Sequence, residues 1–292
     1  DYTEAERLFQ TSLTIKEELG YRAGISNSYY QLGVIAELRG DYTEARQRFQ
    51  ASLAISEALG NRAEIAGRYD RLGRIAARQG HYSEAEQRFQ TSLNINEELG
   101  HQGSIANSHY WLGIVAQMRG DYTQAEERFQ TSLAISEELD NRADIASVTG
   151  RLGFIAELRE DYTHAEQHYQ TSLAISEELD NRADIASVTG QLGILRTKQG
   201  QLAEGISYNI NALAIHLELE SPDVSTDIFW LARQRQEAGE ESFIEILSNL
   251  LDADSVQFVI DSVNTMEGRP GAPGADAQFG VGDHDVGEGD LR

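Results

Sequence analysis

The stretch TSLAISEELDNRADIASVTG occupies residues 131–150 and occurs again, letter for letter, at residues 171–190. With this offset of 40 residues (171 minus 131), the sequence aligns in rows without a gap from residue 1 to residue 200, and more weakly beyond. A fixed period of this size is typical of solenoids, in which each repeat packs only on its neighbours. The duplicated stretch therefore predicts a repeat architecture, and it carries little information about a partner.

Each row of 40 residues contains two amphipathic segments. In the second row, the first segment covers residues 41–59, where the Asp41 side chain can cap a helix N-terminus and Gly60 can end the helix in the left-handed conformation. The second segment covers residues 63–79 and ends before Gly80. Apolar residues recur in both segments at helical spacing. We therefore expect an all-α fold of antiparallel helix pairs joined by short turns.

Four columns of the alignment predict the core. A glycine recurs inside a predicted helix, where it costs about 1 kcal/mol relative to alanine, so we expect a helix crossing too close for a Cβ atom. Alanines, large aromatic rings and leucines recur at matching positions of the other helix, and we interpret them as core residues. The columns are Gly33, Gly73, Gly113, Gly153 and Gly193; Ala5, Ala45, Ala85, Ala125 and Ala165; Phe9, Phe49, Phe89, Phe129 and Tyr169; and Leu13, Leu53, Leu93, Leu133 and Leu173.

The spacing L-G…G-x-Y-x-x-A-x-x-x-F resembles that of the tetratricopeptide repeat, and it is carried here by Leu32, Gly33, Gly40, Tyr42, Ala45 and Phe49. The resemblance covers residues 1–239. The common unit of that family has about 34 residues, and the longer unit of this chain is similar to the arrays of kinesin light chain and of STAND ATPases. The resemblance implies a right-handed α-solenoid that acts as a scaffold for protein–protein interaction.

The repeat pattern predicts three regions. Residues 1–220 form the array, which begins with a helix of a preceding repeat. Residues 221–266 form a degenerate repeat and helices that cap the apolar end of the stack. Residues 267–292 are rich in Gly and Asp, with almost no large apolar side chain, and we expect them to be disordered. Because residue 1 is an Asp inside a repeat, we expect the chain to be a C-terminal fragment of a longer protein.

The composition narrows the classes of function. The chain has 48 acidic residues against 24 Lys and Arg, and a net charge of −24 argues against nucleic-acid binding. Cysteine is absent, which excludes disulfides and thiolate metal sites. Since no apolar run reaches the roughly 18–20 residues of a membrane span, we expect a cytoplasmic protein with no membrane partner. The acidity fits a halophilic source and a GC-rich genome equally well.

The tetratricopeptide resemblance implies that the first helix of each pair lines a concave face, whose outward residues bind ligand. On this face Arg71, Arg74 and Arg78 follow at i, i+3 and i+7, and aromatic residues beside arginine are typical of binding hot spots. We therefore predict a groove for a protein or peptide segment with an acidic part and an apolar anchor. The alternative is that the arginines pair with Asp70 and nearby carboxylates while the aromatic residues pack against the next repeat. The predicted groove residues are Asn27, Tyr30, Gln31, Val34, Arg71, Arg74, Arg78, Asn107, Tyr110, Trp111, Ile114, Met118, Arg151, Phe154, Gln191 and Ile194.

Candidate sites for catalysis or metal binding are few. His164 and His168 lie four residues apart and could face one metal ion, but no third ligand is near, so we interpret the pair as a solvated helix face. Asp283, His284 and Asp285 lie in the predicted disordered tail, where no preorganised site can form. The sequence therefore predicts no enzyme, no metal site and no cofactor.

Two hypotheses stand beside the interaction scaffold. The chain could be the sensor arm of a larger signalling protein of the STAND ATPase type, in which ligand capture releases an upstream nucleotide-binding domain. It could also self-associate, because its N-terminal face is an uncapped half repeat.

Overall fold

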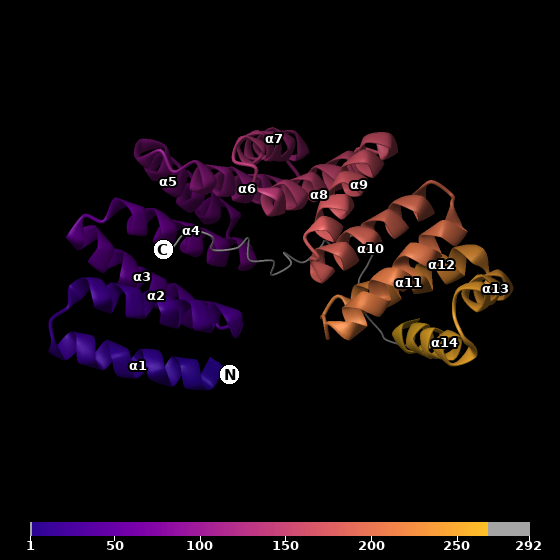
Figure 1. Ribbon diagram of the computed structural model, residues 1–292, viewed down its shortest axis with the longest axis horizontal. Coiled ribbons are helices and arrows are strands. Elements are labelled where there is room, and N and C mark those ends of the chain that lie inside the picture. The colour runs from indigo at the N-terminus through magenta and orange to yellow at the C-terminus, as the bar shows by residue number, and fades with distance from the viewer. Residues whose placement is uncertain (1, 268–292) are drawn as a thin grey trace. The chain divides into compact units, whose positions relative to one another are not determined.

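The computed structural model describes residues 2–267. These residues form fourteen α-helices and no strand (Figure 1), so the predicted all-α repeat fold is confirmed. The chain divides after Asp140 into two compact units, unit 1 and unit 2, each described by itself. Unit 1 contains α1 (Tyr2–Glu18), α2 (Arg22–Leu38), α3 (Tyr42–Leu59), α4 (Arg62–Arg78), α5 (Tyr82–Leu99), α6 (Gln102–Met118) and α7 (Tyr122–Glu138). Unit 2 contains α8 (Arg142–Leu158), α9 (Tyr162–Glu178), α10 (Arg182–Lys198), α11 (Leu202–Glu218), α12 (Val224–Ala238), α13 (Glu240–Leu250) and α14 (Ala253–Glu267).

The ends of the helices follow from their capping residues. The Asp41 side chain accepts a hydrogen bond from the Glu44 backbone N–H at 2.9 Å and so begins α3. Gly60 ends α3 with a φ of 70°. After α8 and α9 the same left-handed conformation is taken by Glu160, with a φ of 61°, and by Asp180, with a φ of 53°. For residues with a Cβ atom this conformation costs about 1–2 kcal/mol.

An aromatic ring packs against the glycine in four helix pairs, and Asn209 takes the place of the ring at Gly193. A Cβ atom placed on Gly73 of α4 would lie 2.8 Å from the Phe89 ring of α5, and one on Gly153 of α8 would lie 2.7 Å from the Tyr169 ring of α9. Both rings are almost fully buried. The prediction that the glycine column marks a crossing too close for a Cβ atom is therefore confirmed.

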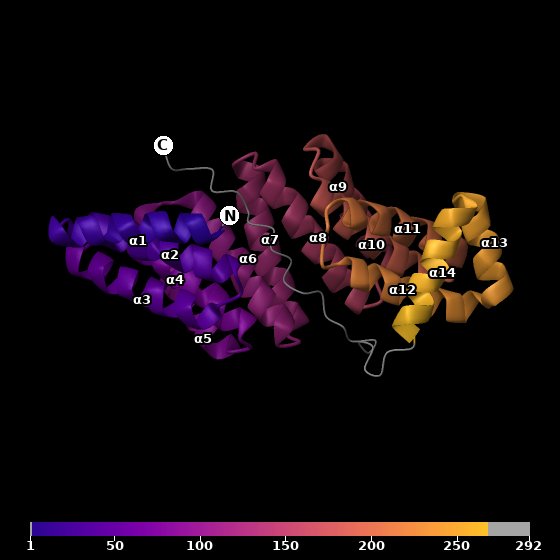
Figure 2. The same cartoon turned by 90° about the horizontal axis from the view of Figure 1, so that it is seen from below.

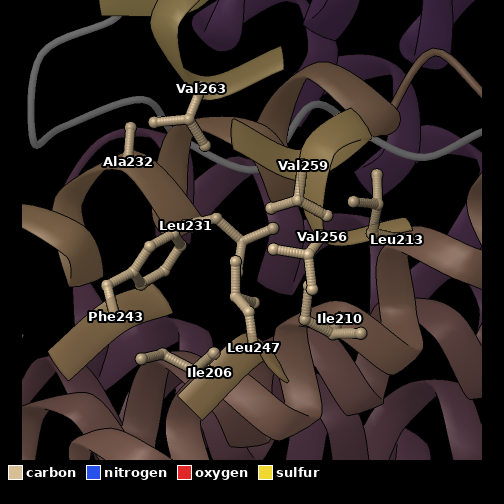
Figure 3. Packing of buried hydrophobic residues seen from close by; sticks show 10 residues of the cluster. All are labelled: Ile206, Ile210, Leu213, Leu231, Ala232, Phe243, Leu247, Val256, Val259 and Val263. Carbon is tan, nitrogen blue, oxygen red and sulfur yellow. The ribbon is translucent and has the colours of Figure 1, made fainter. Parts of the chain in front are cut away.

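At the C-terminal end of unit 2, four helices share one apolar cluster. Leu213 of α11, Leu231 of α12, Phe243 of α13 and Val263 of α14 all lie in it (Figure 3). Both α13 and α14 contact α12, and they lie beside it in the two views of Figures 1 and 2. The cluster joins the last three helices to the repeat array.

Two sequence predictions fall partly or wholly outside the described residues. They are the disordered tail from residue 267 onward and the triple Asp283, His284 and Asp285. Within residues 2–267, none of the helices has the length and apolar character that crossing a membrane requires.

Candidate functional site

The predicted groove residues lie on the first helix of each pair, which is α2, α4 or α6 in unit 1 and α8 or α10 in unit 2. Asn27 is exposed. Ten side chains are partly buried: Tyr30, Gln31, Val34, Arg74, Arg78, Asn107, Tyr110, Met118, Arg151 and Phe154. Five residues are buried: Arg71, Trp111, Ile114, Gln191 and Ile194. For these five the expectation of an outward, exposed position is wrong, and ligand binding by the groove stays a prediction.

Neighbouring helices cover these side chains. Trp111 of α6 stacks on Phe89 of α5, with ring centroids 5.8 Å apart and planes 11° apart. The Tyr169 hydroxyl of α9 lies 3.4 Å from Oε1 of Gln191 on α10. The period of the sequence identifies the face on which a residue lies, but it does not give the distance to the next helix. The groove prediction therefore did not include this coverage, whereas the alternative considered from the sequence had the aromatic residues pack against a neighbouring repeat.

Glu37 of α2 holds two of the three predicted arginines of α4. Its side chain is 7% exposed, with Oε2 at 3.4 Å from Arg71 Nη1 and Oε1 at 3.9 Å from Arg74 Nε. Arg71 also donates from Nε to the Tyr30 hydroxyl at 3.1 Å. Burial acts to lower the pKa of the Arg71 guanidinium, but its interactions with Tyr30 and Glu37 raise that pKa above the ordinary value. The arginines thus pair with a carboxylate, as in the alternative considered from the sequence.

The three arginines of α4 and the carboxylates beside them have a positive total charge. Arg71, Arg74 and Arg78 contribute three positive charges, and Glu37 and Asp70 contribute two negative charges, so the local sum is +1 (3 − 2). The whole chain carries a net charge of −24. This face can therefore attract an acidic segment that most of the surface repels.

Aromatic rings and guanidinium groups lie next to one another on the same face. The Arg74 Cζ atom is 4.9 Å from the centre of the Trp111 ring, and the Arg78 Cζ atom is 5.9 Å from the centre of the Tyr42 ring. Tyr110 meets Trp111 edge-on, with centroids 5.7 Å apart and planes at 85°. A cation within about 6 Å of an aromatic centre is attracted to the ring. These contacts hold the arginines in place before any ligand binds.

Unit 2 repeats the buried carboxylate with different partners. Glu157 lies three periods after Glu37 (157 − 37 = 120), and its side chain is 3% exposed. Its Oε1 accepts a hydrogen bond from Lys198 Nζ at 2.8 Å, and its Oε2 accepts one from the Tyr169 hydroxyl at 2.8 Å. Burial and Glu157 raise the pKa of that hydroxyl well above its usual value. The predicted groove residues include neither glutamate, and a further signal for the second was the tyrosine at 169, where earlier rows have phenylalanine.

A second aromatic pair lies on α12 and was also missed. Phe229 and Trp230 meet edge-on, with centroids 5.8 Å apart and planes at 81°, and both are partly buried. The Arg233 Cζ atom lies 5.4 Å from the centre of the Trp230 ring. The signal was the run Phe-Trp-Leu-Ala at residues 229–232, which corresponds to Tyr-Trp-Leu-Gly at residues 110–113. The offset of 119 residues (229 − 110) is one short of three periods, so the two runs do not lie in the same register of the 40-residue alignment.

The histidines of the described chain form no metal centre. Among residues 2–267, no group of three His, Asp or Glu side chains could hold a metal ion. The His164 side chain is 65% exposed, and its Nδ1 lies 2.7 Å from Asp161 Oδ2. His216 of α11 and Asp227 of α12 form a buried pair, with 2.6 Å between Nδ1 and Oδ2, that the sequence did not predict.

Comparison with known proteins places this geometry in a family. The sequence matches the model of the tetratricopeptide repeat over residues 1–58, 24–98 and 104–178. No curated protein matched the sequence. The fold is similar to that of BtubC (BKLC) from P. vanneervenii, with a TM-score of 0.65 and 19% identity over 75% of this chain and 92% of that one.

Two Rap proteins have similar structures. The apo form of RapI has a TM-score of 0.65 and 13% identity, over 88% of this chain and 99% of that one. A second Rap protein has a TM-score of 0.61 and 15% identity, over 84% of this chain and 75% of that one. At such low identity these likenesses show the fold alone.

The family match rests on the repeat itself. It covers more than half of the chain and includes the Leu-Gly, Tyr, Ala and Phe positions quoted above from residues 32–49. It indicates no enzyme family. The chain belongs to the tetratricopeptide repeat family.

Proposed function

We propose that this chain is a non-catalytic scaffold whose unit 1 binds a protein or peptide segment on the face formed by α2, α4 and α6. The observation that carries the proposal is a set of arginines held by Glu37 and by aromatic rings, on a face with a net positive charge. Side chains that are already fixed lose little conformational entropy when a ligand binds. The segment that fits carries a carboxylate for the arginines and an apolar side chain beside them.

Burial divides the residues of this face between two roles. Arg71 and Trp111 are buried and form the floor that positions their neighbours. Arg78, Tyr110 and Met118 are partly buried and are left to touch the ligand. A substitution of Arg71 would therefore disturb the fold as well as binding, whereas a substitution of Arg78 tests binding more directly.

A related structure supports an interaction role. One of the two similar Rap proteins was solved in complex with Competence and Sporulation Factor. A chain of this fold thus accommodates a partner, and we propose the same general use for the solenoid described here.

The test begins with the selection of binders from a random peptide library on the full chain. We expect the selected peptides to be enriched in Asp or Glu beside an aromatic or aliphatic residue. Arg78→Glu should weaken the best binder at least about tenfold, which corresponds to about 1.4 kcal/mol. Fluorescence anisotropy of the labelled peptide measures the change.

Arg62→Glu is the matched control, because it changes the net charge by the same amount. Arg62 lies at the N-terminal end of α4, its side chain is 48% exposed, and it pairs with Glu98 of α5. We expect it to leave the affinity close to that of the parent chain. Equal losses in the two variants, or selected peptides without acidic residues, would overturn the proposal.

A further inference from the structure

Unit 2 has an aromatic surface that the proposed function does not use. We call Phe229, Trp230 and Arg233 the α12 surface. The Arg233 side chain is 42% exposed and lies 3.8 Å from Glu237, while both aromatic residues are partly buried. Leu231, which faces away from this surface, is fully buried. A partly open tryptophan beside an arginine is the composition of a binding hot spot.

The last turn of α14 packs against the other side of α12. Arg235, two residues after Arg233, donates a hydrogen bond from Nη1 to Asn264 Oδ1 at 2.7 Å and so joins α12 to the last turn of α14. Val263 of α14 and Ala232 of α12 lie in the same buried cluster (Figure 3). The segment that begins at residue 268 therefore starts at the side of α12 that carries Leu231 and Ala232, and its length decides whether it reaches the α12 surface.

The sequence of this segment, residues 268–292, matches the chemistry of the α12 surface. It contains two arginines against five acidic residues, so its net charge is −3 (2 − 5). Its aromatic residue is Phe279, and Asp276 and Asp283 lie three residues before and four residues after it. Such a segment carries an aromatic anchor with a carboxylate on either side.

We propose that residues 268–292 of this chain dock on the α12 surface, with Phe279 against Trp230 and a neighbouring carboxylate at Arg233. Two aromatic rings attract each other in edge-on or offset geometry, and a guanidinium beside them pairs with a carboxylate. The rest of the chain is strongly acidic and repels the segment, so an arginine beside an open aromatic pair is its complement.

The length of the segment allows this contact. From Glu267 to Phe279 the chain has 12 residues (279 − 267), which span at most about 40 Å when extended. The 15 residues of α12 are about 22 Å long as a helix. Phe279 can therefore reach any point of α12. Because the segment is tethered, its effective concentration at the surface is on the order of millimolar, which favours it over a free competitor.

The test uses the full chain, which contains no cysteine and two tryptophans. Gly282→Cys introduces one attachment site for a nitroxide spin label, three residues after Phe279. With ¹⁵N-labelled tryptophan, the indole N–H groups of Trp111 and Trp230 give two separate NMR signals. We expect the label to broaden the Trp230 signal strongly and to leave the Trp111 signal sharp. Reduction of the nitroxide should restore the broadened signal.

Phe279→Ala in the labelled chain is the matched control, because it keeps the tether and its charge. If Phe279 is the anchor, most of the Trp230 signal returns in this variant, and Arg233→Glu has a similar effect. Both substitutions lie outside the buried cluster, and circular dichroism checks that the helices are unchanged. Equal broadening with and without Phe279 would show mere proximity and overturn the proposal.

Two other outcomes would also overturn it. Loss of the Trp111 signal in place of the Trp230 signal would mean that the anchor binds the aromatic pair of unit 1. A mixture of spin-labelled chains without ¹⁵N and ¹⁵N chains without the spin label tests for contact between copies. Strong broadening of the Trp230 signal in this mixture would identify a second copy as the occupant. The experiment contains no added ligand and reports on unit 2, so its result is independent of peptide binding by unit 1.

Discussion

The Phe89 ring occupies the space that a side chain at Gly73 would need. The ring is fully buried, and an added Cβ atom would lie 2.8 Å from it, a distance at which one of the two groups must move. Glycine inside a helix costs about 1 kcal/mol of propensity, so this position exchanges local stability for close packing. Whether a substitution at Gly73 raises or lowers the free energy of unfolding depends on which is larger, the gain in helix propensity or the cost of overlap with the Phe89 ring.

We expect Gly73→Ala to lower the free energy of unfolding, because overpacking a filled core costs typically about 1–3 kcal/mol and outweighs the gain in helix propensity. Gly67→Ala on the same helix is the control, since no atom lies within 4 Å of its added Cβ. That control should gain up to about 1 kcal/mol. Urea denaturation measures both changes. Shifts of the same sign would contradict the prediction.

Glu160 offers a second test at the scale of one residue. It follows α8 in the left-handed conformation that glycine adopts at Gly80, two periods earlier (160 − 80 = 80). Glu160→Gly should therefore stabilise unit 2 by about 1 kcal/mol, by removing the contact of Cβ with the backbone. Glu160→Ala retains the Cβ atom and should give no such gain. Differential scanning calorimetry of the parent chain and the two variants measures their unfolding temperatures. A gain in Glu160→Ala equal to that in Glu160→Gly would contradict the prediction.

The contact between α11 and α12 depends on a buried ionisable pair. His216 occupies the position that Ser136 and Ser176 hold in the two preceding rows, and it faces Asp227. Burial acts to lower the pKa of His216, but the hydrogen bond and the charge of Asp227, together with Asp223, raise it above the usual value. Burial also raises the pKa of Asp227. In both groups the folded state therefore holds its proton more tightly than the unfolded state.

These pKa shifts make the free energy of unfolding depend on pH, and they determine the direction of the change. The stabilisation from His216 is present below its unfolded pKa of about 6.5 and is lost as the pH rises through the higher folded value. His109 of α6 has the opposite effect on stability, because burial and Arg128 lower its pKa. Its contribution to the free energy of unfolding is therefore lost as the pH falls below about 6.5.

We expect amide hydrogen exchange, corrected for its intrinsic pH dependence, to report the two effects separately. Protection of α11 and α12 should fall as the pH rises, and protection of α6 should fall as the pH drops. His216→Gln should abolish the first effect and leave the second. The same pH response in both helix groups would refute the assignment.

At the scale of the molecule, the period of the sequence was sufficient to predict the helix pairs and the glycine crossings. Their determinants are local, since Asp41, Gly60 and Gly73 each act within one repeat. Exposure on the inner face was not predictable in the same way. Arg71 is buried because it pairs with Glu37 in the preceding repeat, a position that holds alanine one period later. Contacts of this kind depend on the distance between repeats, which the period does not encode.

The net charge of −24 implies that salt affects the whole molecule. Raising NaCl from about 0.1 M to about 1 M shortens the screening length from about 10 Å to about 3 Å and weakens the repulsion between carboxylates. We expect the urea midpoint to rise with salt. If the chain is unfolded at the lower salt concentration even without urea, this would indicate a halophilic source. A urea midpoint that is the same at both salt concentrations would refute the expectation.

The glycine–aromatic contact has a consequence for how such an array can change its length. Gly73 of α4 and Phe89 of α5 belong to the same helix pair, so a 40-residue unit counted from residue 61 to residue 100 contains the whole contact. An in-frame duplication or loss of one such unit leaves the contacts of the other units intact. The identical stretches at residues 131–150 and 171–190 lie one period apart, as a duplication of this kind would leave them. The pair of Glu37 and Arg71 joins two different rows, and it would be broken by the same event. Recombination can therefore change the number of helix pairs without loss of the contacts within each pair. The contacts between pairs on the proposed binding face must then be restored by point substitution.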